Sequence, residues 1–212
     1  MKLIRLLILP LTLLLLTSCN LPFQKLNPDT LIGNPGTLSH IRMLDGKTGE
    51  MVVFAPGEDT QAVLNFIESL NGTYDPEFGA SAGYLYWLAG YRDGKEVFRL
   101  TFGSSIVRVD GKRYKLNRGI SSELDQIYAM APYGTLLTKA MNDLADQLEV
   151  QVNEIKPISV DAHTFPNASL GVPEEGKSYA QVKTQGYIFT LSYDGVLAIY
   201  HATNDRIVQV PN

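Results

Sequence analysis

Cysteine is nearly absent from this sequence of 212 residues, in which Cys19 is the single example. One cysteine cannot form a disulfide within the chain, and it excludes the paired cysteines of zinc ribbons and dithiol redox sites. The folded part must therefore be held together by packing alone. The apolar fraction of 45% is ordinary for a globular protein, so we expect a hydrophobic core without cross-links.

An excess of positive charge is also lacking. The chain has 18 Lys and Arg against 22 Asp and Glu, which gives a formal net charge of −4. Proteins that bind nucleic acid usually carry a basic stripe, because contacts to phosphate dominate their affinity. We therefore expect no nucleic-acid partner.

Recognisable catalytic, phosphate-binding and metal-binding motifs are missing. Residues 79–83, Gly-Ala-Ser-Ala-Gly, have the spacing of a nucleophile elbow, but a strand-like aromatic run follows where a helix is required. His40, His163 and His201 lie far apart and have no ligand spacing. One alternative stays open, a metal site formed if His163 approaches His201 across a sheet near Asp161. Otherwise we expect no catalytic residue, no cofactor and no metal site.

Long apolar runs are missing as well. Only residues 6–16 are apolar in near succession, interrupted by Pro10 and Thr12. About ten residues are too few for a membrane-spanning helix, which needs about 20. They suit the central region of a signal peptide, and Lys2 and Arg5 supply the positive charge expected before it.

The residues that end this segment, Leu16-Thr17-Ser18-Cys19, resemble the lipobox of bacterial lipoproteins. The resemblance implies cleavage before Cys19 and attachment of lipid to its thiol, and two or more acyl chains anchor a protein stably. It implies a lipid-anchored protein on the extracytoplasmic face of the cell membrane. The alternative is an ordinary secretory signal with an incidental cysteine.

Composition divides the chain into four parts. Residues 1–18 are the expected signal peptide, and residues 19–39, rich in Pro and Gly without periodicity, are the lipidated N-terminus and a flexible tether. Residues 40–131 and 133–212 are predicted to be two folded units, separated near Pro132. We predict an α+β fold, in which two small antiparallel-sheet units each have packed helices.

In the first unit, turns that contain Asp-Gly or Gly alternate with short apolar runs, which predicts hairpins. Strands are expected over residues 41–44, 51–54, 84–91, 96–102, 106–109 and 112–116. A helix capped by Asp59 or Thr60 should end at Asn71-Gly72, and a second one should start at Ser121 or Ser122.

The second unit opens with a predicted helix over residues 135–148. Leu137, Met141, Leu144 and Leu148 fall on one apolar stripe of this helix. Three or four antiparallel strands should follow, over residues 155–164, 179–183, 187–193 and 196–200.

Tyr84, Tyr86 and Trp87 belong to the richest aromatic cluster of the sequence. Apolar residues fall on both faces of this segment, as in a central strand buried between two layers. The alternative is an exposed platform on which a glycan or a peptide stacks. These three residues are therefore one candidate binding site.

A second candidate lies in residues 165–173, Phe-Pro-Asn-Ala-Ser-Leu-Gly-Val-Pro. A loop of this composition presents Asn167 and Ser169 to a partner, or else hydrogen-bonds its own backbone as turns do.

The same motif, together with Tyr-Ala-Gln-Val at residues 179–182 and Tyr200-His201, resembles an uncharacterised domain at the C-terminus of secreted bacterial proteins. That family reads Trp-Pro-x-x-Ser-Leu-Gly-Cys-Pro, and the resemblance covers about residues 135–210. Phe165, Val172 and Gln185 stand where Trp, Cys and Pro are usual. The resemblance thus implies a fold and a secreted location but no thiol chemistry.

These observations favour a non-catalytic, membrane-anchored module that binds a protein, a peptide or a cell-wall component of the envelope. The C-terminal strands, up to about residue 208, also resemble PepSY-type modules, small secreted domains thought to bind or inhibit peptidases. A third hypothesis is a hydrolase of envelope polymers, with Asp75 and Glu77 as a carboxylate pair.

Overall fold

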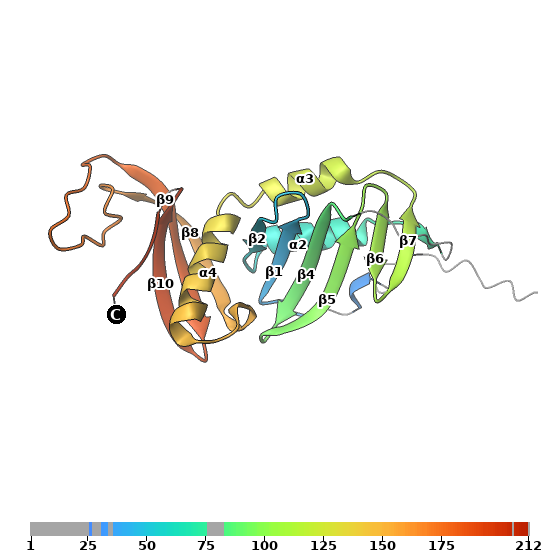
Figure 1. Ribbon diagram of the computed structural model, residues 1–212, viewed down its shortest axis with the longest axis horizontal. Helices are drawn as coiled ribbons and strands as arrows, with labels where there is room; N and C mark the ends of the chain where they lie inside the picture. Colours follow the sequence, from blue (N-terminus) through green and yellow to red (C-terminus); the bar gives the residue numbers. More distant parts are fainter. Residues whose placement is uncertain (1–25, 27–30, 34–35, 76–82, 205, 212) are drawn as a thin grey trace, which may run out of the picture.

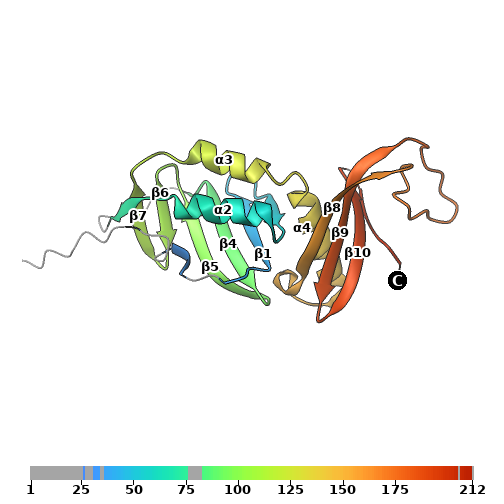
Figure 2. The same cartoon turned by 180° about the vertical axis from the view of Figure 1, so that it is seen from behind.

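The computed structural model describes residues 26, 31–33, 36–75, 83–204 and 206–211. In these ranges, α-helices and two antiparallel sheets of seven and four strands form an α+β protein, as the sequence predicts (Figures 1 and 2). Cys19 and the rest of the lipobox lie outside the described residues, as do Glu77 and residues 79–82.

The first unit is built on the seven-stranded sheet, with the strand order β2-β1-β4-β5-β6-β7-β3. The predicted hairpins are present, and β3 is a short additional strand that pairs with β7. The strands are β1 (His40–Asp45), β2 (Met51–Phe54), β3 (Gly72–Tyr74), β4 (Tyr86–Arg92), β5 (Lys95–Phe102), β6 (Ile106–Val109) and β7 (Lys112–Leu116).

Two helices, α2 (Glu58–Glu68) and α3 (Ser121–Ala129), cover one face of this sheet (Figure 2). The start of α2 differs from the prediction, because Gly57 occupies the N-cap position and no side chain caps it. The hydroxyl of Thr60 instead donates a hydrogen bond to the carbonyl of Ala55 at 2.7 Å, where it holds the helix against the end of β2. The predicted cap is therefore wrong, although the predicted helix is present.

Part of the segment expected to be a tether belongs to the folded unit. Leu26, Leu31, Ile32 and Leu38 are buried in the hydrophobic core. The backbone N–H of Leu26 also donates to the carbonyl of Gly72, at the start of β3, at 2.9 Å. The first unit thus begins before residue 40.

The second unit consists of α4 (Gly134–Leu148) packed on a four-stranded sheet with the order β11-β10-β9-β8. A 3-10 turn, η1 (Val152–Glu154), connects helix and sheet. The predicted strand at residues 179–183 is wrong, since this segment is irregular, and the fourth strand lies nearer the C-terminus. The strands are β8 (Lys156–Phe165), β9 (Thr184–Tyr193), β10 (Val196–Thr203) and β11 (Arg206–Gln209).

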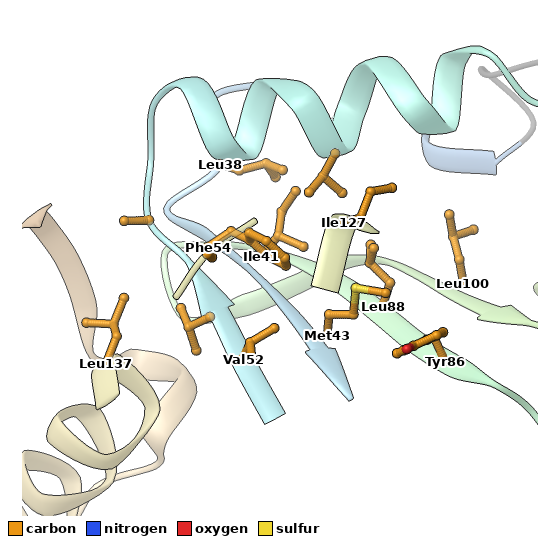
Figure 3. Close-up of a cluster of buried hydrophobic side chains, with 14 of the residues drawn as sticks. Leu38, Ile41, Met43, Val52, Phe54, Tyr86, Leu88, Leu100, Ile127 and Leu137 are labelled. Carbon is orange, nitrogen blue, oxygen red and sulfur yellow. The ribbon is translucent and has the colours of Figure 1, made fainter. Parts of the chain in front are cut away.

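Helix α4 also packs against the first unit, along its edge strand β2. The hydroxyl of Thr138 donates to the carbonyl of Met51 at 3.2 Å, and Leu137 belongs to the same buried cluster as Val52 (Figure 3). A Cβ on Gly134 would lie 2.7 Å from the Cβ of Val52, so only glycine permits this approach. One continuous set of buried side chains therefore runs through both units.

Candidate functional site

The candidate site is the face of the seven-stranded sheet opposite to α2 and α3, turned toward the viewer in Figure 1. Residues of five successive strands stand directly opposite one another there, and each is half-buried. Together with Arg99 we call them the open face: Leu44, Trp87, Thr101, Arg108 and Arg113. Apolar and basic side chains thus share one partly accessible surface.

Arg99 is held in a defined position on this face. Its Nε donates to Glu96 Oε1 at 2.8 Å, and its Nη2 donates to the other carboxylate oxygen. The guanidinium also lies over the ring of Trp87, 4.4 Å from the centroid. The hydrogen bond to Glu96 raises the pKa of Arg99. Because the side chain is still 52% exposed, part of the guanidinium stays accessible to a ligand.

Arg108 and Arg113 form a cross-strand pair of like charge. Such pairs destabilise a sheet slightly, so sheet stability does not explain this one. Arg113 is partly balanced by Asp75, whose carboxylate lies 3.4 Å away. The arrangement concentrates positive charge on β6 and β7.

Two shallow hollows lie on the same face. One, of about 420 Å³, is lined by Glu96, Arg99 and Arg108 together with the turn between β6 and β7. The other, of about 490 Å³, is lined by Tyr84, Arg113 and the loop between β5 and β6. An extended ligand that crosses the open face would therefore meet a guanidinium in each hollow.

The structure separates the three aromatic residues that the sequence groups together. Tyr86 is buried on the helix-covered face, where its hydroxyl donates to Asp125 at 2.6 Å. Tyr84 precedes β4, is 40% exposed and lines the second hollow. Trp87 lies on the open face beneath Arg99. The three do not form one stacking platform, and Trp87 acts as a support for Arg99.

The loop of residues 165–173 uses its polar groups internally. Asn167 Oδ1 accepts from the N–H and the hydroxyl of Ser169, at 3.0 and 2.7 Å. The hydroxyl of Ser169 accepts from the N–H of Gly171 at 3.2 Å, and Ser169 is only 5% exposed. Asn167 and Ser169 thus shape a turn, which supports the structural alternative for this motif over the binding alternative.

His163 and His201 do approach each other, with a phenyl ring between them. Their ring centroids lie 4.7 and 5.0 Å from that of Phe165. Nδ1 of His201 donates to the carbonyl of Leu170 at 2.6 Å, which ties the loop to β10. In the described ranges, no three His, Cys, Asp or Glu side chains are grouped to hold a metal ion.

The strongly shifted pKa values belong to buried groups that support the fold. Desolvation and hydrogen bonds to carboxylates raise the pKa of Tyr86, Tyr133 and Tyr200. Burial, with a smaller effect of Arg42, lowers the pKa of His40 to about 3. None of these four groups lines a hollow of the open face.

Comparison with known families gives one match, over residues 137–210, to a domain of unknown function (DUF8738). The matched segment runs from the first turn of α4 to the residue after β11, so the similarity to this family covers nearly all of the second unit. No curated protein and no solved structure matches the chain. Among the described helices, none has the length and apolarity to cross a membrane.

Proposed function

We propose that this protein is a lipid-anchored envelope protein, acylated on Cys19, whose open face binds an anionic polymer of the cell envelope without catalysis. The ligand class is a glycan or polyol chain that carries phosphate or carboxylate groups. The first part rests on the lipobox-like sequence and the second on the geometry of the open face.

The observation that supports binding is the presence of three guanidinium groups on the open face of the first unit. Although the chain is acidic overall, the open face carries Arg99, Arg108 and Arg113. Guanidinium groups form paired hydrogen bonds with phosphate and carboxylate, which makes them suited to such a polymer.

The position at which the chain joins the folded part is compatible with a surface-anchored protein. Leu26 is bound at β3, one edge of the seven-stranded sheet, whereas the second unit adjoins β2 at the opposite edge. The second unit therefore lies at the end of the sheet opposite to Leu26. In Figure 1 it adjoins β2, on the far side of the sheet from β7. The open face lies between these ends and is accessible from the side.

The anchor is tested by mass spectrometry of the N-terminal peptide after expression in a bacterium that processes lipoproteins. We expect a diacylglyceryl adduct on Cys19 in the wild type and in Ser18→Ala, which keeps a small residue before the cysteine. Cys19→Ala should lack the adduct and leave the membrane fraction. An unmodified cysteine in the wild type would refute the anchor.

Polymer binding is tested with poly(glycerol phosphate) and the full-length protein in nanodiscs of zwitterionic lipid, by calorimetry at low salt. Arg99→Gln should weaken binding about three- to tenfold, because one exposed charge contact is lost. Lys139→Gln, which removes an exposed charge on α4, is the control and should leave binding unchanged. Equal affinity of wild type and Arg99→Gln, or release of shortened polymer, would contradict the proposal, the latter in favour of a hydrolase.

A further inference from the structure

The apolar stripe of α4 extends beyond the surface that its own sheet covers. Leu137, Met141 and Leu144 are buried as the stripe predicts, but Leu148 is 44% exposed. Across from it, at the start of β10, Val196 and Leu197 are 67% and 54% exposed. These three side chains help to line a cleft of about 270 Å³ at the C-terminal end of α4, which we call the α4 cleft.

A polar hollow of about 370 Å³ lies next to the α4 cleft. Tyr193 and Asp194 line both, so the two adjoin at the turn between β9 and β10. The hollow is otherwise lined by residues of both units: Asp93, Gly94, Glu154 and Lys156. Lys156 is paired with Asp93, Nζ to Oδ1 2.8 Å, and this ion pair leaves the negative charge of Glu154 and Asp194 unbalanced within the lining.

Glu154 has a structural role, because its Oε1 accepts a hydrogen bond from the backbone N–H of Gln151 at 3.2 Å and so caps η1. The two aspartates, in contrast, are not required by the turns that carry them. Asp93 and Asp194 occupy the first turn position of two Asp-Gly hairpins, with φ of 50° and 47°. Asparagine adopts this conformation as readily as aspartate, so the turn itself gives no reason for a charge. The last turn of α4, which ends at Leu148, also contains no basic residue to offset the negative end of its dipole. A cation beside the cleft would therefore be stabilised from two sides.

We propose that the α4 cleft binds a basic, apolar polypeptide segment. One aliphatic side chain of the segment contacts Leu148 and Val196, and an adjoining Lys or Arg lies over Asp194 and Glu154. The volume of the cleft suits one or two aliphatic side chains, and the polar hollow requires the ligand to extend by at least one more residue. This site is separate from the open face and does not depend on the function proposed above.

The test uses the peptide acetyl-Leu-Lys-Leu-Lys-amide and the full-length protein in zwitterionic nanodiscs, with empty nanodiscs as the blank. Calorimetry should show binding that weakens about tenfold in the Leu148→Ser, Val196→Ser double variant. Neither side chain is buried, since Leu148 and Val196 are 44% and 67% exposed, so we expect the double variant to fold. Asp194→Asn, which keeps the turn, should weaken binding about threefold and reduce its dependence on salt.

Asp110→Asn is the matched control, because Asp110 occupies the same position of an Asp-Gly turn between β6 and β7, with φ 48°, and does not line the α4 cleft. It should bind the peptide as the wild type does. The acidic peptide acetyl-Leu-Glu-Leu-Glu-amide and the polar peptide acetyl-Ser-Lys-Ser-Lys-amide should bind at least tenfold more weakly. Absence of binding up to about 1 mM, equal binding of the acidic peptide, or equal binding by the double variant would overturn the proposal.

Discussion

His40 should make this protein lose stability when the pH falls from 7 to 5. The imidazole is fully buried, stacked on Tyr91 with ring centroids 4.9 Å apart, and Nε2 has no hydrogen-bond partner among the described residues. Burial, with a smaller effect of Arg42, lowers its pKa from 6.5 to about 3. In this pH range the unfolded chain therefore binds a proton that the folded protein does not bind.

The sign and the size follow from linkage between protonation and folding. Because the pKa of His40 is lower in the folded protein than in the unfolded chain, the free energy of unfolding is highest above pH 6.5. It declines as the pH falls from 6.5 toward 3. From these pKa values, the free energy of unfolding should be about 2 kcal/mol lower at pH 5 than at pH 7 through His40 alone. Each pH unit below 6.5 costs about 1.4 kcal/mol until the folded pKa is reached.

The measurement is urea unfolding of the full-length protein in neutral detergent, followed by the fluorescence of Trp87, the single tryptophan. His40→Phe keeps an aromatic ring against Tyr91 and should remove about 2 kcal/mol of the difference between pH 7 and pH 5. His163→Phe changes an exposed histidine and should leave the difference as it is in the wild type. If His40→Phe retains the full pH dependence, the buried neutral imidazole is not its cause.

Three further predictions concern the second unit. Gly186→Ala should lower the free energy of unfolding by about 1–3 kcal/mol, because its Cβ would lie 2.1 Å from the carbonyl oxygen of Ala202; an unchanged urea midpoint would contradict this. Tyr200→Phe should cost about 1 kcal/mol in the same assay, since the hydrogen bond from the hydroxyl to Asp143, 2.7 Å long, is lost. Arg206→Ala removes a contact to the loop of residues 166–183 and should speed its cleavage by trypsin severalfold, with global stability changed by less than about 1 kcal/mol; equal cleavage rates would exclude this role.

Local signals allow much of the fold to be predicted. Asp-Gly at residues 93–94, 110–111 and 194–195 indicates hairpins, and all three are present. The stripe of α4 predicts that helix to within one residue at its start. The short strand β3 is missed because Gly72 follows Asn71 as a helix stop does, and its pairing with Leu116 joins distant parts of the chain.

The open face could not be predicted, because it depends on strand order and register. Trp87, Arg108 and Arg113 come together only because β4, β5, β6 and β7 are neighbours in the sheet. The period of β4 places Trp87 on one face, but no sequence pattern says which face the helices cover. The exposure of Leu148 likewise cannot be predicted from the apolar stripe of the helix, since it depends on where the second sheet ends.

The way α4 covers β2 has a consequence for biogenesis. A polypeptide that leaves the ribosome or crosses a membrane N-terminus first completes β2 about 80 residues before it supplies α4. Until then the backbone of β2 and the side chain of Val52 lack their cover, as an unprotected sheet edge does. We therefore expect the nascent first unit to be prone to association through this edge until the second unit has been made and covers it.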